Sequence, residues 1–108
     1  MALPLARRFA QYACNLQYEH IPAGVLHEAK RRFLDSFATA VGAMPAEAYH
    51  IAKKVAGRMT STPAVSLLGG GTSSIEWGTF VNGLLIRYLD FNDTYLSKEP
   101  AHPSDNLA

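Results

Sequence analysis

The sequence has one cysteine, Cys14, and almost no net charge. A lone cysteine cannot form an internal disulfide, and its amphipathic surroundings predict a buried thiol in a reducing compartment rather than a nucleophile. Ten Lys and Arg residues nearly balance nine Asp and Glu residues, which leaves a formal net charge of +1. A field that weak does not gather nucleic acid or an anionic membrane surface. We therefore expect neither partner, and we expect a cytoplasmic location.

Long hydrophobic runs are also missing. A membrane-spanning helix needs about 18 or more consecutive apolar residues, whereas the apolar stretch from 3 to 16 is interrupted by Arg7, Arg8, Gln11 and Asn15. We therefore expect no transmembrane helix and no secretion signal.

Metal and phosphate motifs are incomplete in this sequence. The four histidines show none of the close spacings of zinc sites, and the acidic segment that begins at 90 lacks the glycine and the glutamate of a calcium loop. Gly69 to Gly71 are followed by Thr72 without the lysine of a phosphate-binding loop. We therefore expect a plain turn at 69–71 and no metal.

What the sequence does contain is helical periodicity. The 108 residues are 48% hydrophobic, which suits one small globular domain. Apolar residues recur every three to four positions, which predicts helices over 5–18, 22–41, 46–59 and 73–89. A short extended or hairpin segment is expected at 64–72, because its apolar run is brief and glycines follow it. The predicted fold class is all-α with this one short extended segment.

Several residues predict where these helices begin, end and pack. Gly42 suits the position just past a helix end, and Pro45 prevents continuation. Ser73 and Glu76 match a capping box that starts the last helix. One stripe of the first helix should be buried, and the last helix should present a continuous apolar seam to the core. The stripe consists of Leu5, Phe9, Tyr12 or Ala13, and Leu16, and the seam of Trp77, Phe80, Val81, Leu84, Leu85, Tyr88 and Leu89.

The polar loop after the last helix is the candidate site. It gathers acids, hydroxyls, amides and a histidine within RYLDFNDTYLSKEPAHPSDNLA. Asp90 and Asp93 lie three residues apart at a helix exit, where two close carboxylates raise the pKa of one of them. His102 lies in a rigid stretch between prolines, rich in hydrogen-bonding groups. Proton transfer is one interpretation of this pattern; the alternative is that the acids cap or solvate the loop and that His102 has no catalytic role.

The loop's order of residues, LDFNDT followed by HPS, resembles the signature LDF-x-DT … HPS of the MmgE/PrpD family. IPAGVLHEAKRRFLDSFATAVGA is similar to that family's first long helix pair. The resemblance maps the family's loop aspartate, threonine and histidine to Asp90, Thr94 and His102, with Asp93 and Ser104 at flanking motif positions. Asn92 stands where many members have a second aspartate, so a role there that needs negative charge does not carry over.

The resemblance implies a mainly helical N-terminal domain, a second smaller α+β domain, no metal, iron–sulfur cluster or other cofactor, and commonly a homodimer. The loop is closer to the 2-methylcitrate dehydratase type, which eliminates water from 2-methylcitrate to give 2-methyl-aconitate in propionate catabolism, than to the shorter loop of cis-aconitate decarboxylases. The implied substrate is a tricarboxylate. We expect 1–108 to be the N-terminal part of the helical domain, truncated and inactive alone.

Roles follow from the chemistry of dehydration, which needs a base, an acid and cations that hold carboxylates. We expect Asp90 and His102 to transfer or orient protons. Asp93, Thr94, Ser104 and Asn106 are expected to bind substrate. The alternatives are decarboxylation of cis-aconitate, epimerisation of an amino-dicarboxylate, or a non-catalytic, truncated helical module. Whichever of these applies, we expect apolar faces that normally meet missing helices to be exposed.

Overall fold

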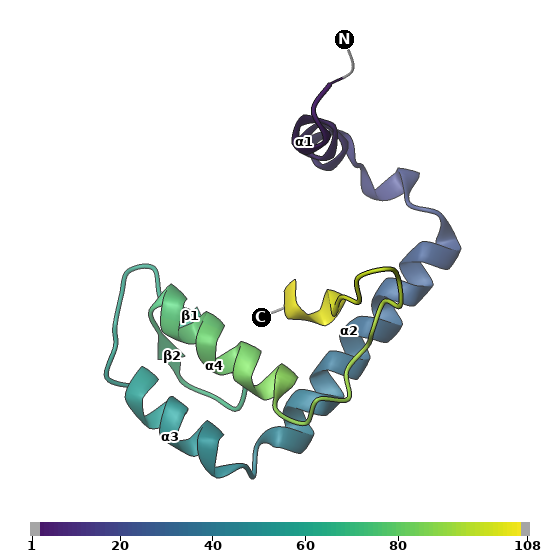
Figure 1. Ribbon diagram of the computed structural model, residues 1–108. Helices are drawn as coiled ribbons and strands as arrows, with labels where there is room; N and C mark the ends of the chain where they lie inside the picture. The colour runs from purple at the N-terminus through teal and green to yellow at the C-terminus, as the bar shows by residue number, and fades with distance from the viewer. Residues whose placement is uncertain (1–2, 107–108) are drawn as a thin grey trace. The chain divides into compact units, whose positions relative to one another are not determined.

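The computed structural model describes residues 3–106, and it is mainly helical with one small antiparallel hairpin (Figure 1). This confirms the predicted fold class. The chain divides into two compact units, Met1–Lys30 and Arg31–Ala108, and each is described by itself. Within the part of the chain that the structure describes, none of the helices combines the length and the apolar character that a bilayer crossing requires.

The first unit contains α1 (Leu5–Asn15), the short 3₁₀ helix η1 (Tyr18–His20) and the start of α2 (Ala23–Ala43). The prediction that the first helix runs to about residue 18 is wrong, because the chain becomes extended at Leu16 (φ −68°, ψ 123°). The predicted burial of its apolar stripe is also wrong: Phe9 is 65% exposed, and the other stripe residues are exposed as well. Cys14 is exposed too, which corrects the expected buried thiol.

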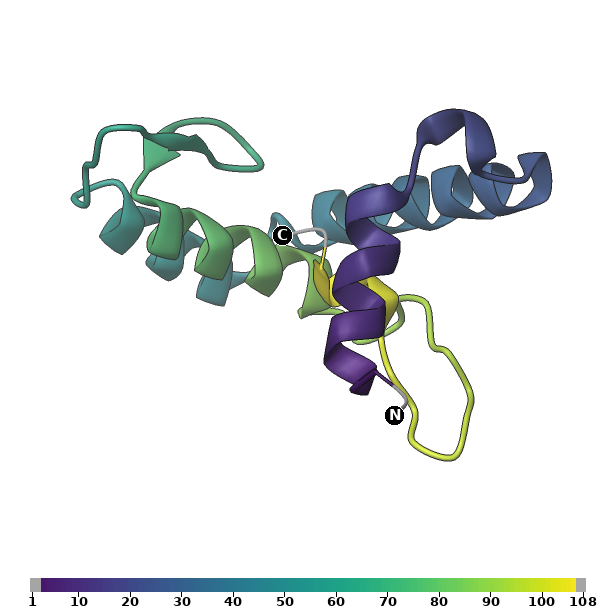
Figure 2. The same ribbon diagram turned by 90° about the horizontal axis from the view of Figure 1, so that it is seen from above.

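The second unit contains the rest of α2, α3 (Glu47–Ala56) and α4 (Ile75–Arg87). Its other elements are strands β1 (Val65–Ser66) and β2 (Thr72–Ser73) and the 3₁₀ helix η2 (Pro103–Asn106). Helices α3 and α4 pack against each other, and the hairpin that joins them in the sequence contacts α4 (Figures 1 and 2). The core between these elements consists of Ala40, Ala43, Tyr49, Ala52, Ala56, Leu67, Val81, Leu85 and Ile86.

The hairpin confirms the expected extended segment and the turn at 69–71. Val65 pairs with Ser73 and Ser66 with Thr72, and Gly69 to Gly71 all have positive φ. The Asn82 side chain holds the turn to α4, because its Oδ1 accepts from the Leu68 N–H at 2.8 Å and its Nδ2 donates to the Ser66 carbonyl at 3.1 Å. The hairpin is therefore attached to α4 through polar contacts as well as apolar ones.

Two predicted helix boundaries are wrong. Gly42 lies inside α2, which continues to Ala43, and a Cβ at Gly42 would lie 3.1 Å from Leu89 Cδ1. Gly42 therefore allows close packing instead of ending the helix. The N-cap of α4 is Ser74, whose side chain accepts from the Trp77 N–H at 3.5 Å. Ser73 has a different role: its hydroxyl donates to the Ala56 carbonyl, 2.6 Å away, at the end of α3.

The predicted seam of α4 is only partly buried. Val81 and Leu85 are completely inaccessible, and Leu84, Leu89 and Trp77 pack against the core. Phe80 and Tyr88 are exposed, which corrects the expected continuous seam. Several apolar residues of α2 are exposed as well, namely Val25, Phe33, Leu34, Phe37 and Val41. These exposed faces agree with the expectation of uncovered apolar surface.

Candidate functional site

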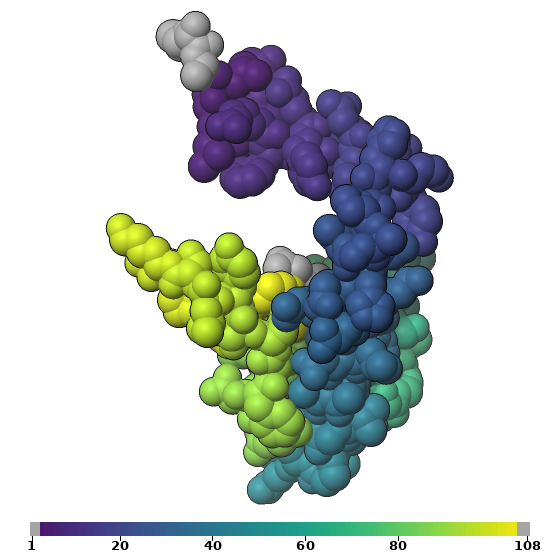
Figure 3. Space-filling model, turned by 90° about the vertical axis from the view of Figure 1, so that its right-hand side faces the viewer, coloured from purple at the N-terminus to yellow at the C-terminus, as the bar shows by residue number. Residues whose placement is uncertain are grey.

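The candidate site is the loop that connects α4 to η2. Its tip is closed by a bridge in which Tyr95 N–H donates to the Ala101 carbonyl at 2.8 Å and Ala101 N–H donates to the Tyr95 carbonyl at 3.2 Å. Figure 3 shows the yellow-green tip projecting from the body of the second unit. The chain enters the loop through Asp90, whose φ of 54° turns it sharply away from α4. The polar residues therefore lie on the two arms of the loop between α4 and the Tyr95–Ala101 bridge. We call these two arms the stem.

Arg87, the last residue of α4, holds the base of the stem together. Its guanidinium donates to Asp90 Oδ1 at 3.0 Å, to Asn92 Oδ1 at 3.3 Å and to Asp105 Oδ1 at 3.2 Å. Asp105 belongs to η2, so one side chain joins both ends of the loop. Asp90 is 77% exposed at its side chain, which leaves this carboxylate oriented by Arg87 and accessible to a ligand.

Asn92 is buried, and its side chain hydrogen-bonds to the backbone. Its side-chain amide donates to the Ile86 carbonyl, one of the carbonyls at the end of α4 that lack a partner within the helix. A carboxylate at this position could not donate that hydrogen bond. This gives a structural reason for asparagine where many members of the resembled family have aspartate.

Asp93 lies higher on the stem and is nearly enclosed, with 4% of its side chain exposed. Its Oδ2 accepts from Arg32 Nη1 of α2 at 3.2 Å, and its Oδ1 accepts from the Ser104 backbone N–H at 3.2 Å. Burial by itself would raise the pKa of the carboxyl, but Ser104 and the Arg32 guanidinium favour the charged form and hold the Asp93 pKa below its usual value. Asp93 is therefore a buried, ionised anchor.

His102 is half-buried and bound to the same residue. Its Nδ1 lies 2.9 Å from the Asp93 backbone carbonyl and 3.5 Å from Thr94 Oγ1. A carbonyl oxygen can only accept, so Nδ1 carries the proton in this hydrogen bond. In the neutral ring Nε2 is then the basic nitrogen. The stem thereby favours the tautomer of His102 that carries its proton on Nδ1. A histidine that accepts a proton through Nε2 needs this tautomer.

Ser104 is 1% exposed, and among residues 3–106 its buried Oγ has no partner at ordinary hydrogen-bond geometry, although the hydroxyl contributes to the lowered pKa of the neighbouring Asp93 carboxyl. Its backbone N–H holds Asp93. Buried hydroxyls are normally paired, so an unpaired one in this loop is unusual. The hydroxyl is thus available to a further polar group.

The structure brings most of the predicted site residues together. Asp93, Thr94, His102 and Ser104 form one contact group, whereas Asp90 is bound to Arg87 at the base of the stem. No hydrogen bond joins Asp90 to His102 within residues 3–106. Asn106 ends η2, and its side chain lies outside the described part of the chain.

Sequence reasoning missed two arginines. Arg32 lies 61 positions before its partner Asp93, and nothing in its local sequence distinguishes it from a solvated arginine on a helix face. Arg87 directly precedes the loop, and its position in the last turn of a helix, three residues before an aspartate, was an available signal. Both side chains are partly exposed.

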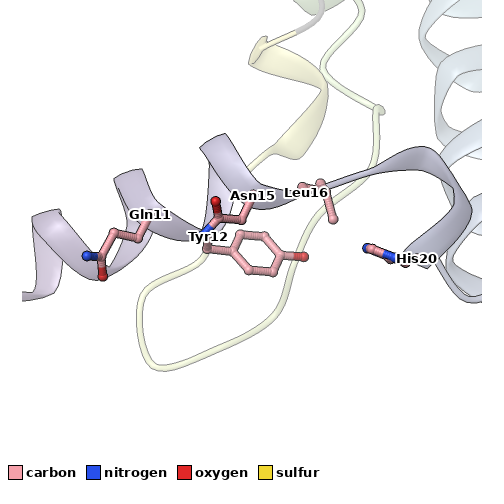
Figure 4. A pocket seen from close by; sticks show the side chains of 5 residues that line it. All are labelled: Gln11, Tyr12, Asn15, Leu16 and His20. Carbon is pink, nitrogen blue, oxygen red and sulfur yellow. The ribbon is translucent and has the colours of Figure 1, made fainter.

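A hollow lies on the first unit. It has a volume of about 390 Å³ and is lined by Gln11, Tyr12, Asn15, Leu16 and His20. Figure 4 shows the Tyr12 hydroxyl directed toward His20 of η1. All five side chains are exposed, so the hollow is open to solvent. It contains none of the predicted site residues.

The described residues do not form a metal site. Between residues 3 and 106, no three His, Cys, Asp or Glu side chains are grouped so that they could hold a metal ion. Asp93 and Asp90 of the loop are instead paired with Arg32 and Arg87, respectively.

Comparison with known proteins gives related sequences of two activities. The chain is 36% identical over 86 residues to a probable 2-methylcitrate dehydratase of Saccharomyces cerevisiae, which covers 76% of this chain and 16% of that protein. It is 29% identical over 116 aligned positions to the cis-aconitate decarboxylase of Mus musculus, covering 96% of this chain and 21% of that protein. A 25-residue segment is 68% identical to the 2-methylcitrate dehydratase of Escherichia coli strain K12, covering 23% of this chain and 5% of that protein.

The chain thus spans about a fifth or less of the length of these relatives. No solved structure matches it significantly. The family model of the MmgE/PrpD N-terminal domain matches residues 7–108, which is nearly the whole chain. With the helical fold, the loop and this match in agreement, the chain belongs to the MmgE/PrpD family.

Proposed function

We propose that this chain is part of a hydro-lyase that eliminates water from 2-methylcitrate to give 2-methyl-aconitate, as a step of propionate catabolism. The observation that carries the proposal is the hydrogen bond from His102 Nδ1 to the Asp93 carbonyl, 2.9 Å long, which makes Nε2 the basic nitrogen of the ring. The names of the yeast and Escherichia coli relatives support the same activity.

The chemistry assigns a role to each part of the loop. Elimination removes a proton from the carbon beside a carboxylate and expels hydroxide from the adjacent carbon. His102 and Asp90 transfer or orient these protons, since both are partly accessible and both are held by a neighbouring group. Thr94, Ser104 and Asn106 donate hydrogen bonds to substrate oxygens. The Ser104 hydroxyl is the best-supported of these three, because it is buried and makes no hydrogen bond of ordinary geometry within residues 3–106.

Asp93 enters the proposal as a supporting residue. A tricarboxylate is an anion, and a buried carboxylate would repel it rather than bind it. The Asp93 carboxylate oxygens already accept from Arg32 and from the Ser104 N–H. Asp93 therefore holds the loop in place, and its backbone carbonyl accepts the hydrogen bond from His102 Nδ1.

The remaining proposals concern the whole protein. The chain spans about a fifth or less of its relatives' length, so we place some of the acid, base and cationic groups in other parts of a family-length protein. The 108-residue chain alone would then have little activity. We propose further that the full-length protein is a homodimer, works in the cytoplasm and uses no metal or cofactor.

The rival activity is decarboxylation of cis-aconitate, which is favoured by the mouse relative that covers 96% of this chain. Both reactions act on a tricarboxylate, but decarboxylation releases carbon dioxide whereas dehydration releases water. The longer loop between the acids and the histidine supports dehydration. The distinction is chemical and can be measured directly.

The test uses a chimera in which residues 7–108 replace the matching segment of the Saccharomyces cerevisiae relative. The chimera is supplied with 2-methylcitrate or with cis-aconitate, and products are identified by proton NMR and by carbon dioxide release. We expect water loss from 2-methylcitrate and no carbon dioxide. Carbon dioxide release from cis-aconitate without dehydration would establish the rival, and dehydration by the 108-residue chain alone would contradict the incompleteness of its site.

A further inference from the structure

Asp93 connects three segments of the second unit. Its backbone carbonyl binds His102 Nδ1 at 2.9 Å, its Oδ1 binds the Ser104 N–H at 3.2 Å, and its Oδ2 binds Arg32 Nη1 at 3.2 Å. His102 and Ser104 belong to the returning arm of the loop. Among the described residues, Arg32 is the side-chain partner of Asp93 from outside the loop, on helix α2. Asp93 therefore fixes the loop histidine and is itself fixed by a helix residue 61 positions away.

We infer that Arg32 is a positioning residue for His102 and acts through Asp93. The guanidinium holds the carboxylate, the carboxylate fixes the Asp93 backbone, and the Asp93 carbonyl sets the orientation and tautomer of the imidazole. The catalytic meaning of this link rests on the proposed function. The link itself is a statement about the folded chain and can be tested without any substrate.

The other contacts of the loop do not replace Arg32. The Tyr95–Ala101 bridge closes the tip beyond Asp93, and Arg87 holds the base at Asp90 and Asp105. Neither of them contacts the Asp93 carboxylate. Between these two levels, Asn92 binds the Ile86 carbonyl and Arg87 and so holds the entering arm to α4, while the Asp93 side chain joins the carbonyl acceptor of His102 to α2.

Loss of the guanidinium has a defined consequence. A carboxylate that is only 4% exposed would then keep only the hydrogen-bonding groups of Ser104 and no positive charge beside it. A buried charge that loses its partner is strongly unfavourable, so the carboxylate would move toward water. The backbone carbonyl moves with it because both groups belong to one residue. His102 Nδ1 then loses its acceptor, and the preference for a proton on Nδ1 falls.

The experiment is long-range ¹H–¹⁵N NMR of the His102 ring in the 108-residue chain, at a pH where the imidazole is neutral. We expect the Nδ1-protonated tautomer to dominate in the native chain. Arg32→Gln should lower the ratio of Nδ1-protonated to Nε2-protonated ring by about fivefold, the effect of one ordinary hydrogen bond. Arg32→Lys should restore part of this ratio, because an ammonium keeps the charge without the planar fork.

Arg58→Gln is the matched control. It removes the same charge from an exposed arginine just beyond α3 and should leave the His102 ratio unchanged. Asp93→Asn tests the Arg32–Asp93 link from the side of Asp93, because it removes the charge that Arg32 binds but keeps the backbone carbonyl. Its effect should equal that of Arg32→Gln, and the double variant should add nothing, as expected for residues that act as one unit.

Two results would overturn the inference. One is a native chain in which His102 carries its proton on Nε2. The other is an unchanged tautomer ratio in Arg32→Gln or, if that variant does not fold by circular dichroism, in Asp93→Asn. An inactive chimera together with the expected NMR change would remove the proposed function and leave the positioning role of Arg32 intact.

Discussion

Two buried serines show how much the hydrogen bonding of a single residue matters. Ser73 and Ser104 are both 1% exposed. The Ser73 hydroxyl shares its proton between the Ala56 and Met59 carbonyls at 2.6 and 3.1 Å, whereas the Ser104 hydroxyl makes no hydrogen bond of ordinary geometry within residues 3–106. Removing a hydroxyl that satisfies buried carbonyls costs about 1 to 3 kcal/mol, while removing an unpaired one costs little or nothing. We therefore expect Ser73→Ala to destabilise the fold and Ser104→Ala to destabilise it much less.

Urea unfolding followed by circular dichroism measures both variants under the same conditions. Ser104→Ala keeps the backbone N–H that holds Asp93. Reduced turnover of this variant in the chimera would then report a lost substrate contact rather than misfolding. Equal loss of stability in the two variants would show that the Ser104 hydroxyl has a partner within the chain.

Asp93 predicts a dependence of stability on pH. Its pKa is lower in the folded chain than the ordinary value of 3.8, because Ser104 and Arg32 more than offset the effect of burial. A carboxyl with a lowered folded pKa stabilises the fold above its unfolded pKa, and this contribution disappears as the pH falls through the folded pKa. The difference in unfolding free energy between the native chain and Asp93→Asn should therefore be largest near neutral pH and shrink below about pH 4.

Urea titrations at a series of pH values measure this difference. Thr79→Ala, at an exposed position of α4 without a titratable group, is the control, and the gap between it and the native chain should stay nearly constant with pH. A native–Asp93→Asn gap that widens on acidification would contradict the assigned direction of the Asp93 pKa.

At the scale of elements, α4 approaches the hairpin so closely that one position has no room for a side chain. Gly78 of α4 is buried, and a Cβ built there would overlap Val65 Cγ2 of β1. Alanine is intrinsically better than glycine in a helix by about 1 kcal/mol, but overpacking of this kind costs about 1 to 3 kcal/mol. We expect Gly78→Ala to destabilise the chain, and we expect the same change to stabilise a Val65→Ala chain, where the methyl group is gone.

Thermal unfolding of the native chain, Gly78→Ala, Val65→Ala and the double variant measures the effect of Gly78→Ala on stability with and without the Val65 methyl groups. Gly24→Ala in α2, where a Cβ would meet nothing within 4 Å, is the control and should not destabilise. A stabilising Gly78→Ala in the native background would mean that the hairpin is not held against α4.

The elements were largely predictable from the sequence, because helix periodicity is a local property. The helix boundaries were harder to predict. Ser73 and Ser74 are both suitable caps in sequence, and only the contact of Ser73 with Ala56 decides that Ser74 caps α4. Gly42 similarly looks like a helix end until packing against Leu89 explains it. Such choices depend on tertiary contacts, which override local preference.

The candidate site was predictable to the extent that it lies in one continuous loop. The grouping of Asp93, Thr94, His102 and Ser104 follows from the loop's return. The contribution of Arg32 could not be predicted, because it depends on where a helix 61 positions earlier packs. Single-sequence periodicity contains no information about such a contact.

At the scale of the whole molecule, both units expose apolar helix faces. Phe9 and Tyr12 of α1 and Phe33 and Phe37 of α2 are all at least two-fifths exposed. Exposed apolar surface of this kind drives association or aggregation. We expect the 108-residue chain to self-associate at micromolar concentration, as measured by sedimentation velocity, and Phe9→Glu to reduce the association by placing a charge in the α1 stripe.

Lys54→Glu, which changes an already exposed polar position of α3, serves as the control and should leave association unchanged. A native chain that sediments as a monomer across this concentration range would show that its exposed apolar faces do not associate.

The central claim is that the loop after α4 handles protons during water elimination, with His102 as its basic group. The most direct test is turnover of 2-methylcitrate by the chimera carrying His102→Gln, compared with His50→Gln, which alters an exposed histidine on α3. Loss of a general acid–base group lowers the rate by about 100-fold or more. We predict that loss for His102→Gln and native turnover for His50→Gln; equal turnover in both variants would contradict the account.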